Sequence, residues 1–225
     1  MIILLIALFA ILAFVANMMI TNRGVRIVTT VIMFVGLILS VAGVAANMNA
    51  HYGMKEVTTT TKKQIYTAGT ASQGFGLLLY QSVGTNGAEN VYVYRATESA
   101  KKTTVAKPSL KTSSRMSNIS GNKAYKITKT TRYVYKNATM RLMFGIGGNN
   151  HQLKNKHVIY QVPSTWVALT TTQAKSLQSK MTPKTDAEKQ ALAQQQAQLA
   201  TLAKTDPDKA AQLQVAAVKK ALNIK

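Results

Sequence analysis

Residues 2–47 read IILLIALFAILAFVANMMITNRGVRIVTTVIMFVGLILSVAGVAAN, and this stretch decides the fold. Two uncharged apolar runs, residues 2–20 and 27–46, are separated by a short turn that holds Arg23 and Arg26. Each run has the ~20 residues that a helix needs to cross a hydrocarbon core about 30 Å thick. We therefore predict that residues 1–50 form a hairpin of two transmembrane helices.

Two alternatives compete with this interpretation. The first run resembles a signal peptide in length, but no Lys or Arg precedes it and no small-x-small cleavage site follows it. The runs are also compatible with buried core helices, although a soluble chain rarely begins with two of them. Small residues would let the two helices approach closely in lipid. They are Ala7, Ala10, Ala13, Ala16, Gly36, Ser40 and Gly43.

The basic residues near the helix ends predict the orientation of the hairpin. Arg23 and Arg26 favour a cytoplasmic turn, which places both termini and the long C-terminal part outside. Lys55, Lys62 and Lys63 follow the second run, but they open a long domain, and such domains translocate largely regardless of charge. The absence of cysteine also fits an exported protein. We predict a multi-pass cell-membrane protein with an extracellular C-terminal domain.

The charge of this domain indicates an anionic partner. The chain has a formal net charge of +21, and residues 99–185 hold 16 Lys and Arg with no Asp or Glu. Such a surface attracts polyanions at long range. Outside the cell we expect an anionic wall polymer or lipid head groups, and inside it nucleic acid or the inner leaflet. The candidate polyanion-binding residues are Lys101, Lys102, Lys107, Lys111, Arg115, Lys123, Lys126, Lys129, Arg132 and Lys136.

Residues 51–182 predict a β-rich domain. Apolar and Thr-rich runs alternate with turns such as Gly84-Thr-Asn-Gly87, which is typical of antiparallel hairpins. Leu77–Asn86 aligns without gaps on Met140–Asn149, so we interpret residues 55–97 and 126–162 as a duplicated three-stranded unit. In this interpretation Met140–Ile146 is a strand. Residues 101–123, rich in Lys and Ser, are expected to form a loop or an irregular edge.

The end of the chain predicts helices. Trp166, the only tryptophan, is expected to anchor the core, and a short helix should follow it as far as Met181. Residues 183–225 are rich in Ala, Gln and Lys and form a helical tail, docked or mobile, with start signals at Thr185-Asp-Ala-Glu188 and Asp206-Pro207. Its apolar stripe comprises Val215, Val218 and Leu222. The predicted fold class is an α+β membrane protein.

The titratable residues do not point to catalysis. The acids of the β-rich part are isolated in sequence, and His151 and His157 have no nearby carboxylate or cysteine to complete a metal site. Gly145-Ile-Gly147-Gly148 lacks the spacing of a nucleotide-binding loop. We therefore expect neither an enzyme nor a cofactor or metal.

Several motifs resemble a known family. They are the two apolar runs followed by His51-Tyr-Gly-Met-Lys, Leu78-Leu-Tyr, Gly84-Thr-Asn-Gly, Lys129-Thr-Thr-Arg-Tyr-Val-Tyr and Thr165-Trp-Val. The chain up to about Met181 is similar to the domain of unknown function 4811, a family of membrane proteins of lactobacilli and their relatives. The resemblance implies no catalytic or binding residue, and it suggests an accessory role beside a multidrug-type transporter. The expected function is a non-enzymatic envelope protein that binds anionic polymer or assists a transporter. A membrane-tethered cytoplasmic nucleic-acid binder is the alternative.

Overall fold

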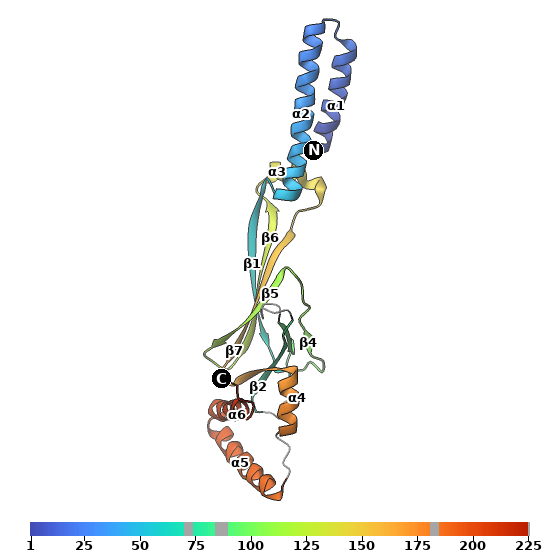
Figure 1. Ribbon diagram of the computed structural model, residues 1–225. Coiled ribbons are helices and arrows are strands. Elements are labelled where there is room, and N and C mark those ends of the chain that lie inside the picture. Colours follow the sequence, from blue (N-terminus) through green and yellow to red (C-terminus); the bar gives the residue numbers. More distant parts are fainter. Residues whose placement is uncertain (70–73, 84–89, 181–184, 225) are drawn as a thin grey trace. The chain divides into compact units, whose positions relative to one another are not determined.

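A computed structural model of the chain describes residues 1–69, 74–83, 90–180 and 185–224 (Figure 1). The chain divides into two compact units, which we describe separately. Unit 1 comprises Met1–Thr58 and Thr131–Lys154, and unit 2 comprises Thr59–Thr130 and Asn155–Lys225. Three long strands contribute residues to both units. They are β1 (Met54–Ile65), β6 (Ala124–Tyr135) and β7 (Gln152–Pro163).

Unit 1 begins with the predicted hairpin of apolar helices, α1 (Ile2–Met19) and α2 (Arg23–Ala50), which lie side by side. Both helices are long and apolar enough to cross a membrane. The connection is shorter than predicted because Asn22 caps α2 by accepting hydrogen bonds from Gly24 and Val25, so both arginines belong to the helix.

Small residues do permit close contact between α1 and α2. A Cβ atom on Gly36 would lie 2.6 Å from the Phe9 ring, and Ala13 and Ala16 are buried. Ala7 and Ala10, which we also expected at this contact, are exposed. The aromatic ring of Phe9 therefore fills the space that Gly36 leaves open.

A polar network joins the end of α2 to the strands of unit 1. Asn47, 2% exposed, donates to the Tyr52 carbonyl at 2.7 Å and accepts from the Asn149 amide at 2.8 Å. Tyr135 donates its hydroxyl to the Phe144 carbonyl at 2.9 Å. Because these buried polar groups are mutually satisfied, the network fixes how the chain turns from α2 into β1.

The segment predicted as the strand Met140–Ile146 is helical instead. It forms α3 (Ala138–Phe144) and the 3-10 turn η1 (Gly145–Gly147). Asn137 caps α3 by accepting a hydrogen bond from the Met140 amide at 2.9 Å. The equivalent stretch of the supposed first repeat lies on strand β2, so the duplication that we inferred from this alignment is not supported.

The strands form two four-stranded sheets, in the orders β1-β6-β7-β5 and β4-β3-β2-β8. Their other members are β2 (Gly76–Gln81), β3 (Val91–Tyr94), β4 (Thr104–Val105), β5 (Thr112–Ile119) and β8 (Trp166–Thr170). The β2–β3 hairpin is confirmed, and its predicted turn at Gly84–Gly87 lies outside the described residues. The wholly antiparallel prediction is wrong, because β5 runs parallel to β7 and β8 parallel to β2. Residues 101–123, predicted as a loop or an irregular edge, contain β4 and β5, which are edge strands of the two sheets.

Two apolar clusters hold unit 2 together. The first lies between the sheets and contains Ile65, Leu78, Tyr92, Tyr94, Ala124, Val158, Tyr160 and Val162. The second lies on the other face of β2 and β8, where Val167 and Leu169 pack against Leu177, Val215 and Val218. The predicted stripe on the last helix is thus confirmed as a packed face.

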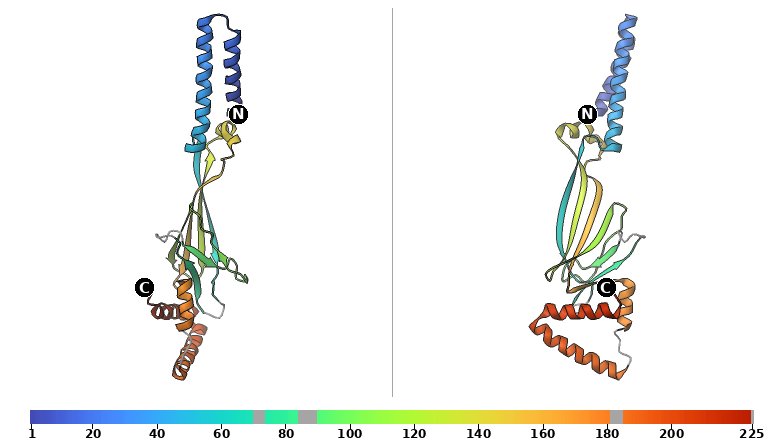
Figure 2. Two further views of the ribbon diagram at one scale, coloured as in Figure 1. Left: turned by 45° about the vertical axis from the view of Figure 1, so that its right-hand side comes forward. Right: turned by 60° about the vertical axis from the view of Figure 1, so that its left-hand side comes forward.

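The helices of unit 2 begin close to the predicted positions. They are α4 (Thr171–Lys180), α5 (Asp186–Thr205) and α6 (Pro207–Ala221). α5 contacts α6 at the turn that joins them and then diverges from it (Figure 2). Thr170 and Gln173 exchange side-chain hydrogen bonds with each other's backbone amide at the start of α4. Asp206 caps α6 through the Lys209 amide at 3.0 Å. The side chain of Glu188, part of the predicted capping box, lies outside the described residues.

Candidate functional site

The candidate polyanion-binding residues are divided between the two units. Arg132 and Lys136 belong to unit 1, and the others belong to unit 2. Within unit 2, the residues Lys101, Lys102, Lys107 and Lys111 flank the short strand β4, Arg115 lies on β5, and Lys123, Lys126 and Lys129 lie on or beside β6. With the exception of Lys126 their side chains are exposed.

Lys126 does not belong to the exposed basic surface. Its Nζ donates to the Tyr94 hydroxyl at 2.6 Å and lies 5.1 Å from the centroid of the Tyr94 ring. The residue follows Ala124 on the face of β6 that meets the core between the sheets. Strand alternation turns this side chain towards Tyr94, so Lys126 is the one candidate that the structure does not place on the exposed surface.

The exposed charge is largely uncompensated. Among the described residues the ion pairs are Lys154–Glu56 and Lys189–Asp186. Hydrogen bonding to Glu56 raises the pKa of Lys154. Leaving Lys111 aside, none of the candidate residues forms an ion pair with any residue that the structure describes. Apart from Lys111, and from Lys123, whose pocket also holds two carboxylates, an anionic polymer would therefore meet cations that are not paired with a described carboxylate.

One face of the sheet in unit 2 combines cations with an aromatic ring. Lys62 lies 4.1 Å from the centroid of the Tyr125 ring. Lys129 follows Tyr125 at even spacing on β6, and Arg115 pairs in register with Ile159, whose neighbours Val158 and Tyr160 face the core. Alternation therefore places these side chains on the face that is turned away from the core. We call Lys62, Arg115, Tyr125 and Lys129 the basic sheet face.

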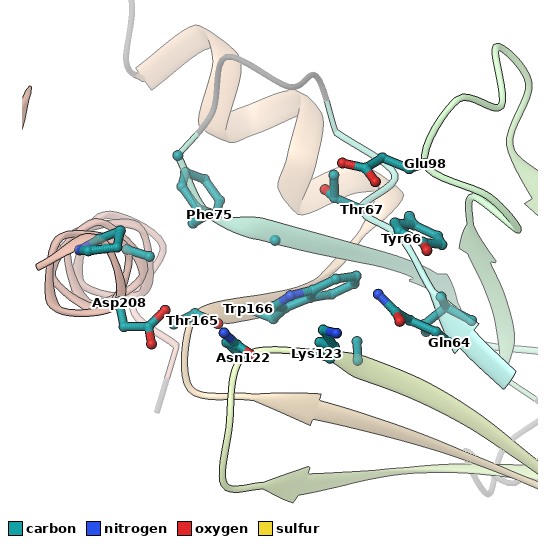
Figure 3. A pocket seen from close by; sticks show the side chains of 16 residues that line it. Gln64, Tyr66, Thr67, Phe75, Glu98, Asn122, Lys123, Thr165, Trp166 and Asp208 are labelled. Atoms are coloured by element: carbon teal, nitrogen blue, oxygen red, sulfur yellow. The ribbon is translucent and has the colours of Figure 1, made fainter. Parts of the chain in front are cut away.

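Unit 2 also contains an open pocket of about 500 Å³ (Figure 3). This size falls in the ~300–1,000 Å³ range that is usual for ligand sites. Its lining is contributed by β1, β2, β8, the start of β6 and the start of α6. The labelled side chains in Figure 3 are Gln64, Tyr66, Thr67, Phe75, Glu98, Asn122, Lys123, Thr165, Trp166 and Asp208.

Trp166 owes its place in the pocket to Gly76. The two residues are partners in the parallel β2–β8 pair, and the Gly76 amide donates to the Thr165 carbonyl at 3.0 Å. A Cβ atom on Gly76 would lie only 2.2 Å from the Cδ2 and Cε2 atoms of the indole. The ring therefore lies directly on the glycine backbone. Trp166 packs against the core, as predicted, but it is only half-buried and also lines the pocket.

The pocket holds two of the seven acidic residues of the chain, Glu98 and Asp208, together with Lys123. All three side chains are exposed, and none forms an ion pair with a described residue. Carboxylates, an ammonium group and the amide of Gln64 beside an aromatic ring provide both hydrogen-bond donors and acceptors. This combination suits a polar, hydroxyl-bearing ring that has one apolar face.

His51 and His157 contact neighbouring side chains. His51 ends α2 in the left-handed region at φ 56° and stacks on Tyr133 with ring centroids 3.7 Å apart. His157 Nδ1 is hydrogen-bonded to the Ser113 hydroxyl. Within the described parts of the chain, His, Asp and Glu side chains form no group of three that would hold a metal ion.

Residues 22–177 match a protein family described as a domain of unknown function, DUF4811. The chain belongs to this family. No curated protein and no solved structure matches the chain. The DUF4811 match begins at the cap of α2 and ends within α4, so it includes the basic sheet face and most of the pocket. The α6 wall of the pocket, with Asp208, lies beyond it.

The pocket of this DUF4811 protein could not be found from the sequence. Gln64, Glu98, Lys123 and Asp208 lie in four separate segments, and nothing in their local sequence links them. For Lys62 of the basic sheet face, the sequence holds one weak indication of its position. The residue lies in a Thr-rich run that is typical of a strand. The glycine at position 76 immediately before an apolar run gave no indication that a tryptophan 90 residues later covers it.

Proposed function

We propose that this DUF4811 protein is a non-enzymatic, membrane-anchored protein of the cell envelope that binds an anionic surface polymer. In this proposal α1 and α2 span the membrane, the turn between them is cytoplasmic, and the remainder is extracellular. The observation that carries the proposal is the exposed and uncompensated positive charge of unit 2.

The hairpin supports the anchoring part of the proposal. The apolar windows of α1 and α2 have only 17% and 0% of their residues buried. Large apolar side chains such as Phe14, Phe34 and Leu39 are more than half exposed. A core helix of a soluble protein would bury such residues, whereas lipid would cover them here. The structure thus favours the membrane hairpin over the core-helix alternative.

The two binding features of unit 2 complement each other. The basic sheet face attracts phosphate or carboxylate groups through charge, and this attraction weakens with salt. The pocket offers an aromatic ring with hydrogen-bond donors and acceptors, which fits a sugar-like or polyol unit of the same polymer. A hydroxyl-rich polyanion of the cell surface would use both.

Charge reversal tests the polymer-binding part. We expect the Lys62→Glu/Lys129→Glu variant to lose at least about tenfold in affinity for poly(glycerol phosphate) at low salt, with a shallower salt dependence, because electrostatic binding scales with the number of neutralised phosphates. Binding of the purified full chain in detergent is measured by fluorescence anisotropy of labelled polymer. Lys204→Glu/Lys219→Glu makes the same change in net charge on α5 and α6 and serves as the matched control. Equal losses in both variants would contradict a specific face.

A second test addresses topology. The chain has no cysteine, and Leu110 is 98% exposed in unit 2, so Leu110→Cys provides a single reactive thiol. We expect a membrane-impermeant maleimide to label this variant in intact cells as strongly as after lysis. Labelling that requires lysis would place unit 2 in the cytoplasm, where nucleic acid becomes the expected polyanion.

The acid-free basic region also motivates that alternative, a membrane-tethered nucleic-acid binder. In that case the full chain should bind single-stranded DNA more tightly than poly(glycerol phosphate) of equal charge, through stacking on the exposed part of Tyr125. An accessory role beside a membrane transporter remains a further proposal. Co-purification from crosslinked membranes tests it.

A further inference from the structure

The short segment α3–η1 in unit 1 leaves apolar side chains uncovered. Leu142 is 60% exposed and Ile146 is 68% exposed. Leu142 lies in α3 and Ile146 in η1, and both are exposed, whereas Phe144 between them is buried. An apolar pair on an exposed helical turn indicates a partner surface.

The N-terminus of the chain fixes where this segment lies. The Met1 ammonium donates to the Leu142 carbonyl at 3.0 Å, near the end of α3 where a helix favours a positive charge. Phe144 packs in one cluster with Ile2, the first residue of α1. Both contacts are internal to unit 1. The segment is therefore held at the level at which α1 begins.

This level corresponds to a membrane surface if the hairpin spans the bilayer. The 18 residues of α1 cover about 27 Å, close to the ~30 Å of the hydrocarbon core. Met1 then lies among the head groups and Ile2 at the edge of the acyl chains. Tyr52, 57% exposed and in edge-to-face contact with Phe144, lies beside the segment, as interfacial tyrosines commonly do.

The charges around α3–η1 suit the same surface. Glu56 is the only acid of unit 1, and it is paired with Lys154. Lys136 and Arg141 are exposed on either side of the start of α3 and form no ion pair with a described residue. Cations next to an apolar pair are typical of segments that lie in the interface of an anionic membrane.

We propose that α3–η1 is an interfacial anchor that inserts Leu142 and Ile146 into the membrane surface at the start of α1. The inference rests on the proposed spanning hairpin. It adds a third attachment point, distant in sequence from α1 and α2, that fixes the base of the long strands at the bilayer. The partner is the lipid bilayer itself, in a leaflet that contains anionic head groups.

Depth measurements test this anchor in the full chain. A nitroxide spin label is attached to the Ile146→Cys variant in vesicles of phosphatidylcholine and phosphatidylglycerol. The depth of the label in the bilayer is determined from its collisions with oxygen and with a water-soluble nickel chelate. We expect a shallow position about 5–10 Å below the head groups. Leu110→Cys serves as the water-exposed control. Val31→Cys in the middle of α2, where the side chain is 54% exposed, serves as the deep control.

The controls distinguish a failure of the proposed anchor from a failure of the proposed membrane hairpin. A deep Val31 label with an Ile146 label as water-accessible as the Leu110 label would overturn the anchor and leave the hairpin intact. A water-accessible Val31 label would overturn the membrane hairpin and the anchor with it. A shallow Ile146 label together with a deep Val31 label supports both.

Discussion

Replacement of Gly76 with alanine is expected to lower the free energy of unfolding by about 1–3 kcal/mol. The added methyl group would lie 2.2 Å from atoms of the Trp166 indole, a separation that no van der Waals contact allows. The indole cannot retreat easily, because Trp166 is held in register with Gly76 and packs on the core between the sheets. Either the ring leaves its place or the β2–β8 pair opens.

The single tryptophan makes this result easy to observe. Urea unfolding of the full chain in detergent is followed by Trp166 fluorescence, and we expect a lower midpoint and a red-shifted native spectrum. Gly145→Ala is the matched control, because Gly145 has φ −59° and its Cβ would come no closer than 3.8 Å to Arg141. That variant should stay within about 0.5 kcal/mol of the wild type.

A compensating change distinguishes steric overlap from other effects. If the indole causes the loss, Gly76→Ala should cost less in a Trp166→Leu background, with a coupling energy of at least about 1 kcal/mol measured by circular dichroism. Additive effects, or an unchanged midpoint for Gly76→Ala alone, would show that the ring is not confined as described.

The elements that the sequence predicts well are those that local chemistry determines. The two apolar runs of the hairpin and the Asp206-Pro207 start of α6 contain their own signals of length, capping and periodicity. The β2–β3 hairpin likewise joins neighbouring strands. In each case the information lies within about 20 residues, so no knowledge of distant partners is needed.

The failures come from interactions between distant residues. Met140–Ile146 has the composition of a buried strand, yet Leu142 and Ile146 are exposed, and the Asn137 cap together with the Met1 ammonium favours a helix. Strands β5 and β6 follow each other in sequence, but β7 lies between them in the sheet. β5 therefore pairs with β7, to which it runs parallel, and does not form a hairpin with β6. Sequence periodicity reports which face is apolar but not which strand is the neighbour.

The same limit applies to the candidate site. Net charge predicted a basic surface, and nine of the ten candidate side chains are exposed. Only the strand register shows that Lys126 points inward to Tyr94 while Lys129 points outward. The pocket depends on segments separated by more than 100 residues, so its residues could not be assigned in advance.

Truncation of Tyr160 to alanine is expected to have the larger effect on stability, with a loss of about 3–5 kcal/mol. The side chain is fully buried and stacks on Tyr92 with ring centroids 4.2 Å apart. Tyr160→Phe provides the control, because the Tyr160 hydroxyl has no hydrogen-bond partner among the described residues. Removal of an unsatisfied buried hydroxyl should leave stability unchanged or raise it. A loss above about 1 kcal/mol in Tyr160→Phe would reveal a partner for the hydroxyl.

The pH dependence of the same variants provides an independent test. Burial raises the pKa of Tyr160 and of Tyr92 above the ordinary value of 10.0. Above that pH the unfolded chain has released protons that the folded chain still binds, so the free energy of unfolding falls as pH rises, by up to about 1.4 kcal/mol per pH unit for each such group. Between pH 9 and pH 11, Tyr160→Phe should therefore lose less stability than the wild type in urea titrations. Identical losses in the two proteins would mean that water reaches the Tyr160 hydroxyl, and that the stacked tyrosines do not form the closed core between the sheets.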